Sequence, residues 1–161
     1  GDDTAQVLAR CWPSGIVDYV AMARYLGTKL HPTPPGQYCS VLAGVNDLVY
    51  RQDDATQIIG NLARIYVYLR RHHSTPFPIT ILPWAHSRSF RAERERVRIE
   101  VNRWIRSQPL AVDVEHIMGD GHTPPGLRSI YDPGDGIHPV GAGPRVLARA
   151  VALRMRAYAE R

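Results

Sequence analysis

Two short segments carry the residue types that acyl-transfer chemistry uses. In residues 135–139 (DGIHP), Asp135 lies three positions before His138, so its carboxylate can reach the imidazole of the same loop. Such a contact fixes the tautomer of a general base and stabilises the imidazolium that forms when the base takes a proton. In residues 44–47 (GVND), Asn46 offers a side-chain amide that can donate to a developing oxyanion. These groups predict acyl transfer, which also requires a nucleophile.

Both segments also have a purely structural interpretation. A loop histidine is often capped by a neighbouring aspartate, and Asp-x-x-His is a common spacing. Gly, Asn and Asp are the usual residues of a turn that ends a strand, which would account for residues 44–47. The functional hypothesis therefore depends on the combination of the two segments.

The elements that position these groups alternate between apolar runs and helical patterns. We expect buried strands over residues 38–43, 79–82 and 110–114. We expect helices after an N-cap at Asp53 or Asp54, over residues 91–106, from Pro144 onward and, at the N-terminus, over residues 4–10 and 16–26. Residues 27–37 are expected to form a connecting loop, and Ser87 and Ser89 to cap the helix that follows them.

Alternating strands and helices predict an α/β fold, a three-layer α/β/α sandwich with a mostly parallel sheet. In such sheets, reactive groups collect beyond the carboxyl ends of the strands. Asn46 and His86 each follow an expected strand, and Asp135 and His138 lie in the loop before the last helix. We therefore expect all four at one edge of the sheet.

Composition excludes several classes of protein. The 161 residues suffice for one domain with a core. The net charge of +5 comes almost entirely from arginines that are interleaved with glutamates along expected helices, which does not favour a nucleic-acid-binding surface. No apolar run is long enough to span a membrane. Cys11 and Cys39 form neither a disulfide framework nor a zinc motif.

In this order and context, the two segments resemble the SGNH (GDSL-type) family of esterases and lipases. Residues 42–48 (LAGVNDL) are similar to the third conserved block of that family, which supplies the oxyanion-hole asparagine, here Asn46. Residues 135–139 are similar to the fifth block, which supplies the catalytic pair, here Asp135 and His138. This is the most specific of the matches.

Residues 1–10 (GDDTAQVLAR) resemble the second block, in which a glycine amide, here that of Gly1, completes the oxyanion hole. The resemblance then covers essentially the whole chain. It implies the flavodoxin-like SGNH hydrolase fold, a small-molecule ester substrate, and neither a metal nor an organic cofactor.

The first block of the family, a Gly-Asp-Ser turn with the nucleophilic serine, has no counterpart here. We therefore expect residues 1–161 to be a single SGNH hydrolase-like domain that is N-terminally truncated, with its N-terminal strands missing or rebuilt and its nucleophile upstream of Gly1. A rival alignment, which we disfavour, makes residues 1–3 the first block, with Asp3 in place of the serine. None of the serines in the chain lies in a glycine-rich elbow.

Trp84 and His86 follow the expected strand at 79–82 and are candidate substrate-pocket residues, although a buried core position is an equal alternative for Trp84. His72 and His73 at a helix end favour contact with the last carbonyls over metal binding. The sequence thus predicts a serine esterase or acylhydrolase of SGNH type. The alternative is a non-catalytic module that binds an acylated glycan or lipid; oligomeric state and compartment are not predicted.

Overall fold

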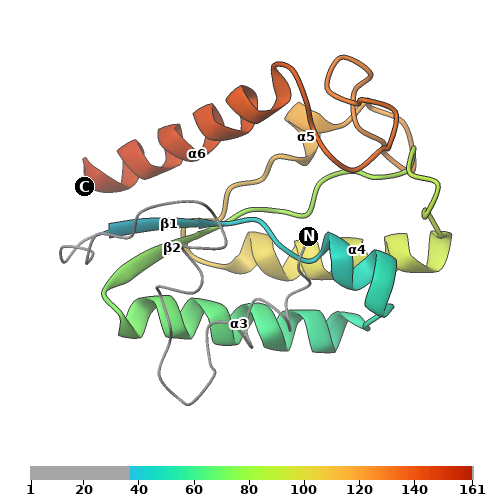
Figure 1. Cartoon of the computed structure of the whole chain (residues 1–161). Coiled ribbons are helices and arrows are strands. Elements are labelled where there is room, and N and C mark those ends of the chain that lie inside the picture. Colours follow the sequence, from blue (N-terminus) through green and yellow to red (C-terminus); the bar gives the residue numbers. More distant parts are fainter. Residues whose placement is uncertain (1–36, 161) are drawn as a thin grey trace, which may run out of the picture.

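The computed structural model describes residues 37–160. Gly1 and the N-terminal helices expected at 4–10 and 16–26 lie outside this range. The elements, in chain order, are β1 (Gln37–Val41), the π-helix η1 (Asp47–Arg51), α3 (Ala55–Arg71), β2 (Ser74–Pro78), α4 (Ala92–Ser107), α5 (Glu115–Met118) and α6 (Gly143–Ala159). The strands lie between α3 and α4 on one side and α6 on the other (Figure 1). Within residues 37–160, no helix has both the length and the apolar character needed to cross a bilayer.

The strands are parallel, as the alternation of strands and helices predicts. β1 pairs with β2 in a register that runs from Gln37 opposite Ser74 to Val41 opposite Pro78. A parallel bridge between Ile79 and Val112 then joins a third extended segment to the sheet. The expected α/β class is confirmed.

The second strand lies earlier in the chain than expected. Its prolines are tolerated because they occupy positions that do not donate hydrogen bonds to β1. The amide of Ile79 donates to the carbonyl of Val41 (2.9 Å), whereas the carbonyl of Pro78 accepts from Val112 (2.7 Å). Since alternate residues of a parallel strand bond to opposite neighbours, Pro76 and Pro78 remove no hydrogen bond to β1. β2 ends at Pro78, one residue before the expected strand at 79–82 begins, and the expected strand at 110–114 is reduced to the bridge at Val112.

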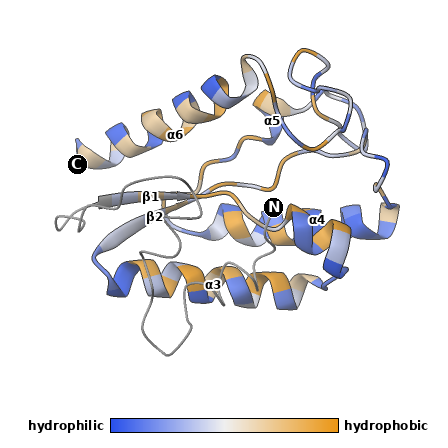
Figure 2. Cartoon of the chain, in the orientation of Figure 1, coloured by the Kyte–Doolittle hydropathy of each residue, from blue (hydrophilic) through white to orange (hydrophobic). Residues whose placement is uncertain are grey.

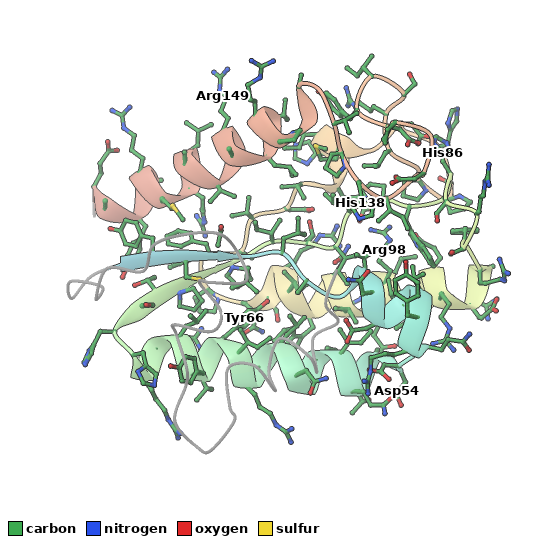
Figure 3. All side chains as sticks on the ribbon, viewed as in Figure 1. Asp54, Tyr66, His86, Arg98, His138 and Arg149 are labelled. Carbon is green, nitrogen blue, oxygen red and sulfur yellow. The ribbon has the colours of Figure 1, made fainter. Side chains whose placement is uncertain are left out.

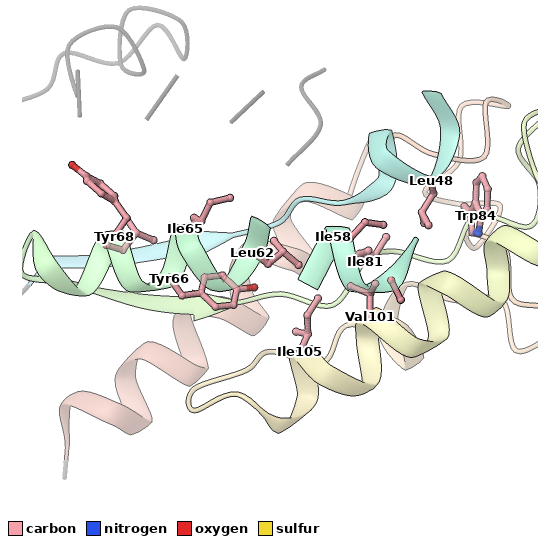
Figure 4. Packing of buried hydrophobic residues seen from close by; sticks show 12 residues of the cluster. Leu48, Ile58, Leu62, Ile65, Tyr66, Tyr68, Ile81, Trp84, Val101 and Ile105 are labelled. Carbon is pink, nitrogen blue, oxygen red and sulfur yellow. The ribbon is translucent and has the colours of Figure 1, made fainter. Parts of the chain in front are cut away.

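Two apolar clusters, one on each side of the sheet, complete the three layers. The first joins α3, α4 and η1, and Figure 4 shows its buried side chains, among them Leu48, Ile58, Leu62, Ile81, Trp84, Val101 and Ile105. The second joins β2, α5 and α6 through Phe77, Ile79, Leu82, Val112, Met118, Leu127 and Val151. The hydrophobic stripe of α3 accordingly faces inward (Figure 2).

The helix starts are only partly as expected. Asp54 caps α3 through a capping box, because its carboxylate accepts from the amide of Gln57 (2.8 Å) while the side chain of Gln57 accepts from the amide of Asp54 (2.9 Å). Helix α4 begins after Arg91 without a side-chain cap, so the expectation that Ser87 or Ser89 caps it is wrong. The hydroxyl of Ser87 instead accepts from the amide of Ser89, within the turn before the helix.

A buried polar network fixes the segment after β2 to α4. Arg98 is completely buried and donates to both carboxylate oxygens of Glu95 (2.7 and 2.8 Å), to Glu115 (2.9 Å) and to the carbonyl of Ile81 (3.0 Å). The amide group of Asn102 bonds both the N–H and the C=O of Ile81. Burial disfavours the charge of Arg98, but hydrogen bonds and charge attraction from Glu95 and Glu115 outweigh it and raise the pKa of Arg98.

Removal of Arg98 tests this network. We expect Arg98→Met to lower the free energy of unfolding by about 3–5 kcal/mol, because it leaves the carboxylate of Glu95 buried without its partner. Urea unfolding followed by circular dichroism measures the change. The matched control is Arg96→Met on the exposed side of α4, for which we expect a change within about 0.5 kcal/mol. Equal effects of the two substitutions would refute the role of the network.

Candidate active site

The loop between α5 and α6 holds Asp135 and His138 in direct contact. One carboxylate oxygen of Asp135 accepts from the backbone amides of Ile137 (2.8 Å) and His138 (2.9 Å). The other lies 2.8 Å from Nδ1 of His138. The side chain of His138 is 73% exposed and is therefore accessible to a substrate.

The protonation state of Asp135 determines the tautomer of His138. Hydrogen bonds from the backbone amides of His138 and Ile137, and then from the His138 ring, lower the pKa of Asp135 to about 2. An ionised carboxylate only accepts hydrogen bonds, so Nδ1 of His138 carries a proton. In the neutral ring, Nε2 is then left with a free lone pair, which a general base requires.

Gly136 lets this loop approach the segment after β2. Its φ is +70°, and a Cβ at this position would collide with the backbone of His86 and Ser87. The loop is also braced by Asp132, whose carboxylate accepts from the amides of Gly134 (2.8 Å) and Gly136 (2.9 Å). The loop that carries Asp135 and His138 is thus held by its own turns and by contact with residues 86–87.

The structure places His86 beside the loop, between two carboxylates that the sequence analysis did not identify. Nε2 of His86 lies 3.0 Å from Asp120, and Nδ1 lies 3.7 Å from Asp132. Burial opposes the charge of Asp120, but hydrogen bonds from the backbone and ring of His122 and from the amide of Gly126 outweigh it and lower the pKa of Asp120. The only sequence signal for either aspartate is its position before a glycine-containing turn.

The turn after β1 approaches the same region. Gly44 has a φ of +118°, and a Cβ there would lie 2.6 Å from the Ile81 side chain, so glycine permits close contact between the two segments. Asn46 follows this turn and is the N-terminal flanking residue of η1, whose backbone it does not cap with its side chain. The preceding Val45 lines a cavity that His138 also lines.

This cavity, which we call the His138 cavity, has a volume of about 170 Å³. It is lined by Leu42, Ala43, Val45, Ile81, Leu82, Pro83, Trp84, Ile137, His138 and Pro139. Trp84 is 1% exposed, and its indole N–H donates to Glu95 (2.8 Å). Trp84 is therefore a core residue, as one of the two sequence-based alternatives had it, and it also lines the His138 cavity.

The remaining candidates are placed as follows. His86 is not among the residues that line the His138 cavity, although both histidines lie at the same end of the molecule (Figure 3). Ser87 lies against Gly136 but is 7% exposed, and its hydroxyl accepts from the amide of Ser89. Within residues 37–160, no group of three or more His, Cys, Asp or Glu side chains is arranged to hold a metal ion.

Comparisons with known proteins agree with this geometry at the level of fold. No protein-family model and no curated protein matches the sequence. A Bacteroides fragilis protein assigned as an acylhydrolase superposes with a TM-score of 0.70 at 18% identity, over 98% of this chain and 71% of its own. A GDSL-like lipase from Bacteroides thetaiotaomicron gives 0.70 at 17% identity, over 97% and 72%. A carbohydrate esterase of family 3 from Talaromyces cellulolyticus gives 0.57 at 18% identity, over 76% and 58%.

The chain has the SGNH (GDSL-type) hydrolase fold. At 17–18% identity, the superpositions show that the fold is shared. The reaction has to be argued from the residues of this chain. Residues 42, 43 and 45 of the segment 42–48 and residues 137–139 of the segment 135–139 line the same cavity, whereas Asn46 and Asp135 are not among its lining residues.

Two glycines of the loop that carries Asp135 and His138 provide a test of its packing. Gly134 and Gly136 both have positive φ, so alanine at either position introduces backbone strain of about 1–3 kcal/mol. Only the Cβ at 136 meets other atoms, and the space at 134 is open. We expect Gly136→Ala to lower the free energy of unfolding by at least about 1 kcal/mol more than Gly134→Ala, because overpacking adds to the strain. Equal losses in urea unfolding would contradict the contact with residues 86–87.

The lowered pKa of Asp135 predicts a pH-dependent contribution to stability. Because the pKa falls from 3.8 to about 2 on folding, the carboxylate stabilises the folded state fully above its unfolded pKa, and this is lost as the pH falls towards 2. We expect the urea midpoints of the unmodified protein and Asp135→Asn to differ above about pH 5 and to converge between about pH 4 and 2. The convergence should persist in a His138→Ala background, since the backbone amides are the largest cause. A constant difference down to pH 2 would contradict the prediction.

Proposed function

We propose that this protein is a serine-type ester hydrolase in which His138 is the general base and Asp135 its orienting carboxylate. The observation that carries the proposal is the 2.8 Å contact between Nδ1 of His138 and Asp135, on a ring that is 73% exposed and that lines an apolar cavity. The names of the superposed acylhydrolase, lipase and esterase support the same class of reaction.

In the first half-reaction, Nε2 of His138 takes the proton of a serine hydroxyl while its oxygen attacks the ester carbonyl carbon. The resulting imidazolium carries protons on both ring nitrogens, and the ionised carboxylate of Asp135 stabilises it through Nδ1. The side-chain amide of Asn46 and the amide of Gly1 are the proposed donors to the oxyanion. Collapse of the intermediate breaks the bond to the alcohol oxygen, which leaves with the proton from Nε2.

In the second half-reaction, water replaces the alcohol. His138 takes a proton from the water as its oxygen attacks the acyl-enzyme carbonyl, and it returns that proton to the serine oxygen when the acid leaves. The His138 side chain is 73% exposed, which favours both proton transfers because alcohol and water have access to the ring from solvent. No metal or organic cofactor takes part in this scheme.

Substitution of His138 tests the proposal. We expect His138→Ala to reduce kcat/KM for a p-nitrophenyl ester by roughly 10⁴-fold or more, since loss of one member of such a triad removes most of the catalysis. The matched control is His122→Ala, because His122 is also exposed and its Nδ1 also lies 3.0 Å from an aspartate, Asp120. We expect the control to keep its activity; equal losses in the two variants would refute the role of His138.

A fluorophosphonate probe identifies the nucleophile independently of the substrate. We expect the probe to label the active protein on one serine, and mass mapping of the adduct shows which serine it is. Labelling that is lost in His138→Ala supports activation by this base. If the complete protein, including any residues that precede Gly1, is neither labelled nor active on esters, the serine hydrolase proposal fails, and the alternative of a non-catalytic module that binds acylated molecules takes its place.

A further inference from the structure

The His138 cavity is apolar everywhere except at its catalytic residue. Nine of its ten lining residues are hydrocarbon or aromatic, and the tenth is His138. The one polar group of Trp84 is turned to Glu95, so it offers no hydrogen bond to a ligand. A cavity of this kind gains free energy by burying hydrocarbon, and it penalises a polar group that enters it without a partner.

The cavity has a closed inner end and an open mouth. Ile81 and Trp84 are each 1% exposed, and Leu82 is 7% exposed, so these residues form its floor. At the other end, Leu42 is 45% exposed and the ring of His138 is 73% exposed. A group inserted past His138 therefore ends against Ile81 and Trp84, and cannot extend without displacing core side chains.

The position of His138 indicates which part of an ester occupies the cavity. The alcohol must leave towards Nε2 and be replaced there by water, which requires the solvent side of the ring. The acyl group stays bound to the nucleophile through both half-reactions and must project away from that side. The inner cavity, between the turn after β1 and residues 137–139, is the direction that remains.

From this geometry we propose that the His138 cavity is the acyl-binding site and selects esters of compact apolar acids, up to about six carbons in length. The size limit follows from the volume of about 170 Å³, since an apolar cavity of about 150 Å³ holds a molecule of the size of benzene. The inference rests on the proposed function for the identity of the reaction, but not for the fit of the ligand. Long-chain acids exceed the cavity, and hydroxylated acids bring polar groups into a wall that offers them no partner.

The first test is a series of p-nitrophenyl esters with straight acyl chains of two, four, six and ten carbons. We expect kcat/KM to rise by up to roughly fourfold per methylene while the chain fits. We expect the ten-carbon ester to fall at least roughly tenfold below the best substrate, because the fixed floor excludes it. A rate that keeps rising to ten carbons, or that does not depend on chain length, would overturn the acyl-site proposal while leaving ester hydrolysis established.

The second test fills the cavity. Ala43 lines it, so Ala43→Leu should move the preferred chain length by two or three carbons towards acetate, whereas Ala148→Leu on the exposed side of α6 should leave the profile unchanged. If Ala43→Leu keeps both its fold, by circular dichroism, and the original preference, the assignment of the cavity is refuted. Should this variant not fold, the chain-length series on the unmodified protein still decides the question.

The third test does not require turnover. Hexanamide, an uncleaved analogue of a six-carbon acyl group, should shift the NMR signal of the Trp84 indole N–H, because the ring lines the cavity. The indole signal of Trp104, which stacks on Tyr66 at a centroid distance of 5.8 Å, should not move. Absence of the Trp84 shift would overturn the inference. A shift without any ester hydrolysis would support the ligand site and refute the proposed hydrolase activity.

Discussion

A fully buried guanidinium is tolerated only when its nitrogens find acceptors. For Arg98 this constraint joins α4 to the segment after β2 and to Glu115. Glu95, Glu115 and the carbonyl of Ile81 satisfy it, and Glu95 also accepts the indole N–H of Trp84. The segment after β2 is therefore attached to α4 by charge-assisted hydrogen bonds as well as by apolar contact. Because the same segment forms the floor of the His138 cavity, the core network also determines the shape of the candidate site.

The loop that carries Asp135 and His138 depends on local hydrogen bonds for its internal structure and on packing for its position. The pairing of Asp135 with His138 is local, since the backbone amides of residues 137 and 138 hold the carboxylate and the ring returns to it within three residues. The placement of the loop is not local. It depends on the contact that Gly136 permits with residues 86–87. The locally formed pair of Asp135 and His138 is thus positioned at the cavity by packing between segments about 50 residues apart in the sequence.

The turn after β1, which lines another part of the His138 cavity, is also positioned by a glycine. At Gly44, a positive φ and the absence of a Cβ allow the turn after β1 to lie on Ile81. The two segments that resemble family blocks therefore each approach the strand-end segment 81–87 at a glycine. At both close approaches a Cβ would meet atoms of that segment at 2.6 Å or less, so these positions require glycine.

The sequence by itself determined the features that depend on local chemistry or on periodicity. The N-cap of α3, expected at Asp53 or Asp54, the apolar stripe of that helix and the alternation of strands and helices follow from spacing alone, and the structure confirms them, with Asp54 as the cap. The Asp-x-x-His spacing likewise predicted the contact between Asp135 and His138, whereas their catalytic role stays a prediction.

Only the tertiary structure decided the features that depend on partners distant in the chain. The shift of the second strand follows from which neighbour each proline faces, and the position of His86 follows from Asp120 and Asp132, which are 34 and 46 residues away. The His138 cavity forms only where three separate segments, residues 42–45, 81–84 and 137–139, pack together. No local pattern encodes these distances, because each results from many weak contacts between elements. The relative placement of those elements is fixed only when the core packs.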